Sequence, residues 1–253
     1  MARGLSDGGE ADIGGGMFPP LERLPEGMRP PKELLLRIVN MNRLLNQRAV
    51  ETECFFKQEE FKTCILKGLG IATLYPNPLL RTSGDVDILL NGGRVKIFNF
   101  ASSRVGLQGV AYQHIHYPLH KEVEVHVTSE HMFAPIENRK LQRYFETCSE
   151  EQFLHKVEFP EGVGAIHGST DEFNRVYILL HIYVHLFGEG IGLRQLLDYY
   201  YVLHQLATTE SKVRTVEMLR QLKMLRFAGT MMWVMQEVFG LEDKYLLVTP
   251  DVK

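Results

Sequence analysis

The sequence predicts an α+β fold in which a small mixed β-sheet comes first and helices alone follow. Short β-favouring segments alternate with helical ones up to about residue 130, and beyond it the apolar residues recur with the helical period. That order is typical of an α+β domain followed by a helical domain. We therefore expect a flexible N-terminal tail over 1–31, an α+β domain over 32–130 and an all-helical domain over 131–253.

The first two parts follow from composition and periodicity. Residues 1–31 are rich in glycine and proline and lack apolar periodicity, which is typical of a flexible tail. The spacing of Leu34, Leu35, Ile38 and Met41 predicts a helix that runs from about residue 32 towards 57. After it we expect these elements: a strand over 61–66, a glycine turn into a short helix stopped by Pro76-Asn77-Pro78, a strand over 84–90, a helix over 95–103, and two antiparallel strands over 109–119 and 121–128.

In the second half of the chain, apolar residues recur with the helical period in several segments. We expect helices over 138–148, 171–187, 193–206, 213–225 and 228–239. The segment 158–168 carries glycine and proline and is expected to be a connector.

The bulk composition is that of an ordinary globular protein. The chain has 253 residues, of which 45% are hydrophobic and 23% charged, with a net charge of −3. This balance argues against a large nucleic acid as partner without excluding it. No apolar run approaches the ~18 residues of a membrane span, no signal-peptide pattern is present, and the three cysteines form neither a zinc motif nor a disulfide framework. We therefore expect a reduced, cytoplasmic protein with no membrane partner.

The stretch RTSGDVDILL, residues 81–90, places two aspartates inside an otherwise apolar strand. Because side chains alternate along a strand, Asp85 and Asp87 point to the same side. Two like charges side by side repel each other and are costly to bury. A divalent cation between them is one explanation, and a solvated strand edge is the other.

A second carboxylate-bearing strand follows. Glu122, Glu124 and His126 share one face of the segment KEVEVHVT, and valines occupy the other. We expect both strands to turn the apolar face inward and the carboxylate face outward. If the strands are neighbours, their carboxylates converge, and Mg²⁺ prefers such oxygen ligands.

Several basic and hydroxyl residues lie close to the aspartates. Lys67 and Gly68 stand at a strand-to-helix junction where backbone N–H groups favour anions, although a plain tight turn explains them equally. Arg81 and Ser83 could contact phosphate oxygens. The alternative for Arg81 is an ion pair with Asp85 or a neighbour.

The histidines and one helical pair leave further alternatives open. His181 and His185 have the i, i+4 spacing of a zinc site, with Glu189 beyond, but packing or hydrogen bonding within the helical region explains them better. Arg194 and Asp198 also stand at i, i+4 and could pair with each other. A histidine metal site formed by His114, His116 and His126 is possible. We expect instead that His126 lies beside Glu124 and orients it.

These motifs together carry a family likeness. The run ILKGLGIATLYPNPLLRTSGDVDILL, residues 65–90, resembles the nucleotidyltransferase superfamily with the polymerase-β-like fold. More closely, it is similar to the bacterial family usually labelled uncharacterised nucleotidyltransferase, whose members carry Lys-Gly, Tyr-Pro-x-Pro and an arginine four residues before Asp-x-Asp. The segments VEVHVTSEHMFAPIENRKLQRYF and HIYVHLFGEGIGLRQLLDYYYVLH extend the likeness over most of the chain.

The resemblance implies a site and an activity. Asp85, Asp87 and Glu124 would be metal-binding and catalytic residues, with Mg²⁺ or Mn²⁺ as the cofactor. The nucleotide would be bound by Lys67, Gly68, Arg81 and Ser83, and Arg194 could reach a phosphate. The superfamily's usual Gly-Ser after the first strand is Gly68-Leu69 here, so a hydroxyl is missing at that place.

The resulting hypothesis is a metal-dependent nucleotidyltransferase. It would move a nucleoside monophosphate from an NTP to an unidentified hydroxyl or phosphate acceptor and release pyrophosphate. Two alternatives stand beside it: a non-catalytic nucleotide-binding protein on the same fold, and a metal-dependent phosphohydrolase that uses the histidines.

Overall fold

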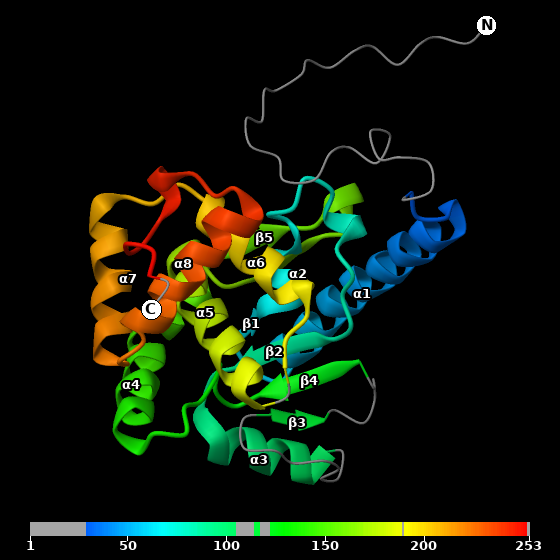
Figure 1. Cartoon of the computed structure of the whole chain (residues 1–253). Coiled ribbons are helices and arrows are strands. Elements are labelled where there is room, and N and C mark those ends of the chain that lie inside the picture. The colour runs from blue at the N-terminus through cyan, green and yellow to red at the C-terminus, as the bar shows by residue number, and fades with distance from the viewer. Residues whose placement is uncertain (1–28, 105–113, 117–121, 189, 252–253) are drawn as a thin grey trace, which may run out of the picture.

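The computed structural model describes residues 29–104, 114–116, 122–188 and 190–251, and Figure 1 shows the arrangement of their elements. The tail expected over 1–31 lies outside this range except for its last three residues. The α-helices are α1 (Lys32–Gln58), α2 (Lys67–Ala72), α3 (Gly93–Arg104), α4 (Pro135–Gln152), α5 (Asp171–Gly188), α6 (Leu193–His204), α7 (Thr209–Gln221) and α8 (Leu225–Phe239). The strands are β1 (Thr63–Ile65), β2 (Val86–Leu90), β3 (His114–His116), β4 (Val123–His126), β5 (Lys156–Glu158) and β6 (Ala165–His167).

A mixed four-stranded sheet lies at the centre, in the order β1-β2-β4-β3. The outer pairs β1/β2 and β3/β4 are antiparallel, and the central pair β2/β4 is parallel. The antiparallel pairing expected for the last two strands is therefore confirmed. The register of the parallel pair sets Asp87 opposite Glu124 and Val86 opposite Val123.

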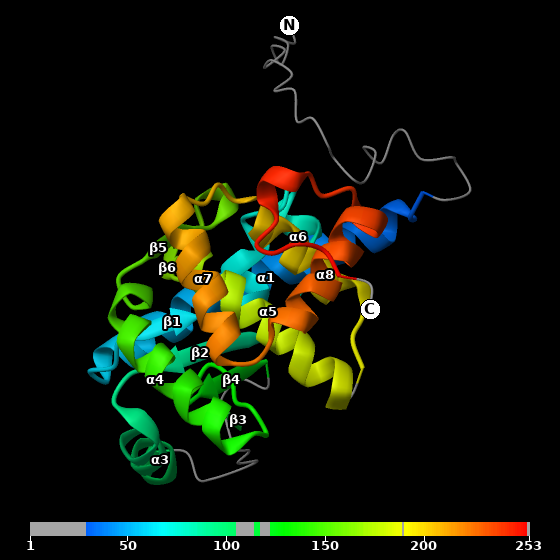
Figure 2. The same ribbon diagram turned by 60° about the vertical axis from the view of Figure 1, so that its left-hand side comes forward.

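Helices cover both faces of the sheet (Figure 1, Figure 2). Val86, Ile88 and Leu90 pack into one hydrophobic core with α1 and α3. Leu89, on the opposite face, belongs to a second core built from α4 to α8. Every residue of β2 is buried, so the expectation of an outward carboxylate face is wrong. A helical layer covers the face that carries Asp87.

The helix α1 closes the first core along one stripe. Its buried side chains include Leu45, Ala49, Thr52 and Phe56, which recur every three or four residues and so lie on one side of the helix. The helix spans the predicted range almost to the residue. The helices that follow the sheet also occur where the periodicity predicts them, with ends that differ by a few residues.

The prediction of a plain connector over 158–168 is wrong. Strands β5 and β6 form an antiparallel hairpin there, and Phe159 and Ile166 are buried in the core with α1. The chain reverses through Glu161 and Gly162, both with positive φ. Three-residue strands are too short to show an alternating pattern, which explains why the turn residues dominate the sequence signal.

The helical layer packs directly on the sheet. In the middle of α5 all residues from Phe173 to Ile182 are buried. The core around α5 also takes in Cys64, Leu66 and Leu89 from the sheet region. The boundary near residue 130 stays a prediction, and residues on both sides of it share this core. None of the described helices is long and apolar enough to cross a bilayer.

A close backbone contact fixes α2 against β1. A Cβ atom added at Gly70 would lie 2.6 Å from the carbonyl oxygen of Ile65. We expect Gly70→Ala to lower the free energy of unfolding by about 1–3 kcal/mol, because the backbone must shift to relieve the clash. Urea unfolding followed by circular dichroism measures this.

The matched control is Gly188→Ala at the end of α5, where an added Cβ meets nothing within 4 Å. It should change stability by no more than about 0.5 kcal/mol. Equal effects of the two substitutions would contradict the contact at Gly70.

Candidate active site

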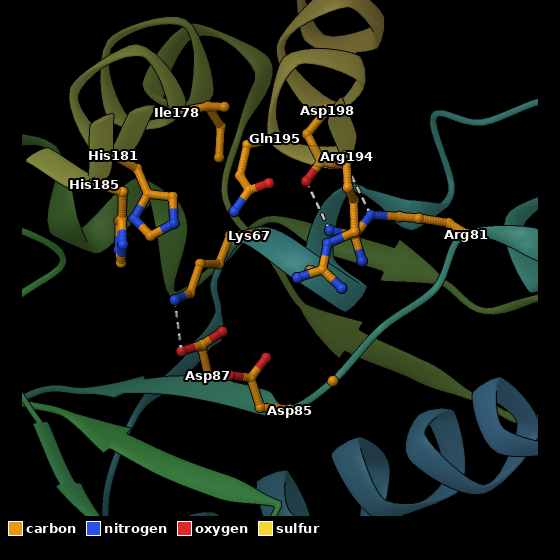
Figure 3. A pocket seen from close by; sticks show the side chains of 12 residues that line it. Lys67, Arg81, Asp85, Asp87, Ile178, His181, His185, Arg194, Gln195 and Asp198 are labelled. Carbon is orange, nitrogen blue, oxygen red and sulfur yellow. Dashed lines mark hydrogen bonds and ion pairs between the residues drawn. The ribbon is translucent and has the colours of Figure 1, made fainter. Parts of the chain in front are cut away.

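The candidate site forms where β2 and β4 begin, on the face covered by the helical layer. Asp87 and Glu124 stand opposite each other on these parallel strands. Asp85 precedes β2 by one residue and, with Asp87, lines a pocket of about 180 Å³. Figure 3 shows the two aspartates side by side at its floor. The alternation of side chains along a strand thus correctly predicts that both aspartates lie on the same face of the sheet.

Asp87 is held by two basic groups. Its side chain is 1% exposed, and its Oδ1 atom lies 3.1 Å from Lys67 Nζ and 2.8 Å from His126 Nε2. His126 Nε2 is 4.0 Å from the nearest oxygen of Glu124. The histidine thus contacts Asp87 more closely than Glu124, the partner we had expected.

The surroundings of the two aspartates shift their pKa values in opposite directions. Burial alone would raise the pKa of Asp87, but Lys67 and the hydrogen bond with His126 outweigh burial and hold that pKa well below its usual value. Burial raises the pKa of Asp85, and the negative charge of Asp87 raises it further. Burial would lower the pKa of Lys67, yet Asp87 and Asp85 raise it above its ordinary value. Asp87 and Lys67 are therefore both charged at neutral pH.

One buried oxygen in this cluster lacks a hydrogen-bond partner. Among the described residues, nothing donates to Asp87 Oδ2, although the atom is buried. Asp87, Glu124 and His126 each offer one ligand atom, and these atoms lie within 4.8 Å of one another. A buried, unsatisfied carboxylate oxygen beside a second carboxylate fits a divalent cation.

The turn that brings Lys67 to the site has unusual backbone geometry. Lys67 and Gly68 have φ values of 30° and 20°, and the ψ of Gly68 is −98°. Positive φ is uncommon for a residue other than glycine and concentrates at functional sites. The glycine turn after β1 was predicted, whereas the ion pair of Lys67 with Asp87 was not.

Arg81 is tied to the helical layer by a buried ion pair. Its Nε and Nη2 atoms each lie 2.7 Å from an oxygen of Asp198 on α6. The hydroxyl of Tyr75 donates to the same carboxylate at 2.6 Å, and Ser83 Oγ accepts from Arg81 Nη1 at 2.9 Å. The ion pair considered for Arg81 is present, but its partner is Asp198 of the helical layer, which the sequence does not indicate, and not Asp85. Arg81 lines the pocket with the aspartates, whereas Ser83 faces a separate groove beside α1.

Arg194 faces the pocket from the start of α6. It is exposed, donates to the backbone oxygen of Thr82 at 3.0 Å, and points towards the aspartates in Figure 3. The pair considered between Arg194 and Asp198 is not formed, since Asp198 is paired with Arg81. The pocket beside Tyr75 and Leu193, about 580 Å³, shares Arg81 and Arg194 with the first.

The helix α5 closes the pocket opposite the aspartates. His181 and His185 line it, and His181 Nδ1 lies 3.0 Å from Glu130 Oε2. Burial would raise the pKa of Glu130, but hydrogen bonds with His131 and His181 lower it to about 2. The hydrogen bonding expected for His181 is present. Glu189 lies outside the described residues.

Two site residues, Glu130 and Asp198, have partners that the sequence could not indicate. Glu130 follows β4 in a loop and meets a helix 51 residues further on. Asp198 meets Arg81 across 117 residues. The only local signals were the loop after the Glu-x-His strand and the helical spacing of Asp198. His114 and His116 pair in register with His126 and Glu124, but their side chains lie outside what the structure describes.

Comparison with known protein families identifies the family of the chain. The model of a family described as uncharacterised nucleotidyltransferase matches residues 21–240. The match covers most of the chain, so the chain belongs to this family. No curated protein matches it.

Among solved structures, a similar chain is an antigenic nucleotidyltransferase-like protein from Paracoccidioides brasiliensis. It is 12% identical, covers 74% of this chain and 92% of its own, and has a TM-score of 0.35.

The pair Arg81–Asp198 yields a stability prediction. Both side chains are nearly inaccessible, at 5% and 7% exposure, so Asp198→Ala leaves a buried guanidinium without its counter-charge. We expect a loss of about 3–5 kcal/mol in the free energy of unfolding. Replacing both residues by Met and Leu should recover part of it.

The matched control is the exposed bidentate pair of Arg214 with Glu172. Arg214→Ala should leave stability almost unchanged, because solvent screens such pairs. If chemical unfolding gives equal losses for both substitutions, Arg81 and Asp198 do not form a buried link.

Proposed function

We propose that this chain is a metal-dependent nucleotidyltransferase. It moves a nucleoside monophosphate from an NTP to a hydroxyl or phosphate acceptor and releases pyrophosphate. The observation that carries the proposal is the pocket that Asp85 and Asp87 line together with Arg194. Glu124 stands opposite Asp87 on the neighbouring parallel strand. Family membership supports the same reaction class.

Asp85, Asp87 and Glu124 are the proposed ligands of Mg²⁺ or Mn²⁺. Their oxygens are the ligands that these hard cations prefer, and the unsatisfied Asp87 Oδ2 supports the assignment. When bound, the cation offsets negative charge on the phosphates and on the leaving pyrophosphate. Lys67 holds Asp87 charged and in place.

Arg194 is the proposed phosphate-binding residue. It is exposed on the pocket wall opposite the aspartates, and guanidinium groups bind phosphate through paired hydrogen bonds. Lys67 and the turn at Gly68 complete the phosphate end of the site. Arg81 is bound to Asp198 and Ser83. We therefore assign to Arg81 the role of holding α6 in place beside the phosphate-binding residues. The adjoining pocket beside Tyr75 offers room for the remainder of the nucleotide or for the acceptor.

Glu124 is the proposed general base. Its side chain is 21% exposed, so an acceptor could approach it, whereas Asp87 is closed off. The acceptor oxygen attacks the α-phosphorus and gives its proton to Glu124. The bond from the α-phosphorus to the bridging oxygen breaks, and pyrophosphate leaves with the electron pair.

One observation favours the non-catalytic alternative. Leu69 occupies the place of the superfamily's usual serine, and its side chain is buried in the core with α1 and α3. No hydroxyl contacts phosphate from that position. A protein of this kind would bind NTP with metal but release no pyrophosphate.

The first test is calorimetric titration with ATP and with GTP, each with and without Mg²⁺. We expect Mg²⁺ to increase the affinity of the wild type, and Asp85→Asn/Asp87→Asn to lose that increase, a change of about tenfold or more, or ~1.4 kcal/mol. The matched control is Glu210→Gln/Glu217→Gln, which removes two exposed carboxylates from α7. Binding that is indifferent to Mg²⁺ and to the aspartates would sink the proposal. Binding without pyrophosphate release would favour the non-catalytic alternative.

The second test concerns Arg194. Arg194→Ala should weaken ATP binding about tenfold or more, since a hydrogen bond to a charged group contributes about 1.5–3 kcal/mol. Adenosine, which lacks phosphate, should bind both proteins equally. Arg139→Ala on the exposed face of α4 is the control. Equal losses for ATP and adenosine would mean that Arg194 does not contact the phosphates.

A further inference from the structure

A second set of ligating side chains lies where α5 borders the pocket. Glu130, His181 and His185 each offer one ligand atom, and these atoms lie within 4.8 Å of one another. Two of them, His181 and His185, line the pocket opposite Asp85 and Asp87 (Figure 3). None of the three has a place in the proposed nucleotidyl transfer.

Rigid elements hold the three residues together. His181 and His185 are one helical turn apart on α5, so their rings lie on the same side with centroids 4.2 Å apart. Glu130 lies between β4 and α4, and its side chain is 1% exposed. Its Oε2 atom lies 3.0 Å from His181 Nδ1. Only small side-chain movements are needed for all three to reach one ion.

The donor types select the ion. Two imidazoles with one carboxylate suit Zn²⁺ and similar transition metals, whereas Mg²⁺ prefers oxygen ligands alone. We propose that Glu130, His181 and His185 form a transition-metal site for Zn²⁺ or an ion of like chemistry. Three protein ligands leave a fourth position open, and here the two histidines border the pocket.

This site is distinct from the one formed by the aspartates. Lys67 is bound to Asp87 at 3.1 Å and also lies within electrostatic range of Glu130. The carboxylates of Asp85, Asp87 and Glu130 all act on its positive charge. The inference needs neither the proposed reaction nor a bound nucleotide, so it can fail or succeed independently of them.

A hydrogen-bonded cluster without metal is the competing explanation. Glu130 Oε1 accepts from the backbone N–H of His131 at 3.0 Å, and Oε2 lies against His181. That arrangement satisfies part of the buried carboxylate. The experiment must therefore show an ion on these ligands.

The test titrates the metal-free full-length protein with Zn²⁺ by calorimetry and with Co²⁺ by visible absorption. We expect one Zn²⁺ per chain in the wild type and in Asp85→Asn/Asp87→Asn. His185→Asn should weaken binding about tenfold or more, the change expected from losing one ligand of three. His185→Cys, which supplies another zinc ligand, should restore much of the affinity.

The matched control is His204→Asn. His204 is half-buried in the last turn of α6, as His185 is in α5, and it is not among the clustered ligands. This variant should bind Zn²⁺ like the wild type. If His185→Asn and His204→Asn weaken binding equally, or if the double aspartate variant abolishes it, the proposal is wrong.

X-ray absorption of the zinc-loaded wild type decides the matter without any variant. Scattering from two imidazole rings around the ion is the expected result. Absence of Zn²⁺ binding by the wild type, or an ion with oxygen ligands only, would overturn the assignment.

Discussion

A carboxylate buried between a sheet and a layer of helices is the constraint on which the site depends. Asp87 lies on β2 with almost no access to water. A charge in such a place must be offset by groups already held nearby, because water cannot do so. Lys67 reaches it from the turn after β1, and His126 from the neighbouring strand. The positive φ at Lys67 is the backbone geometry that accompanies this contact.

The interface between sheet and helices is therefore divided in two. Towards the end of β2 it is apolar, since Leu89 joins the core around α5. At the start of β2 it is polar and hollow, with Asp85 at the floor and Arg194 on the wall. The pair of Arg81 with Asp198 stands at the edge of the hollow and fixes α6 to the loop before β2. On the same face of β2, Asp87 thus contributes a charge to the site, and Leu89, two residues further on, contributes an apolar side chain to the core.

The sequence predicts patterns that repeat locally and misses contacts that depend on the third dimension. Helical periodicity was sufficient for α1 and for the helices after residue 130, and alternation along β2 placed Asp85 and Asp87 on one face. The alternation of side chains along a strand does not indicate which element covers each face of the sheet. The carboxylate face was therefore expected to be exposed to solvent. Nor can spacing choose between partners: i, i+4 favoured Arg194 for Asp198, but the buried Arg81 has the greater need of a counter-charge. The hairpin of β5 and β6 is too short to be periodic.

The link from Arg81 to Asp198 joins residues 117 positions apart in the chain. A fragment that ends near residue 130 would keep the paired aspartates but would lose Asp198, the counter-charge of Arg81. It would also expose the apolar side of the sheet at Cys64, Leu66 and Leu89. The first half of the chain is thus not a transferable module, although it carries every proposed ligand of the Mg²⁺ or Mn²⁺ ion. In evolution or in engineering, the sheet and the helices would have to be inherited together.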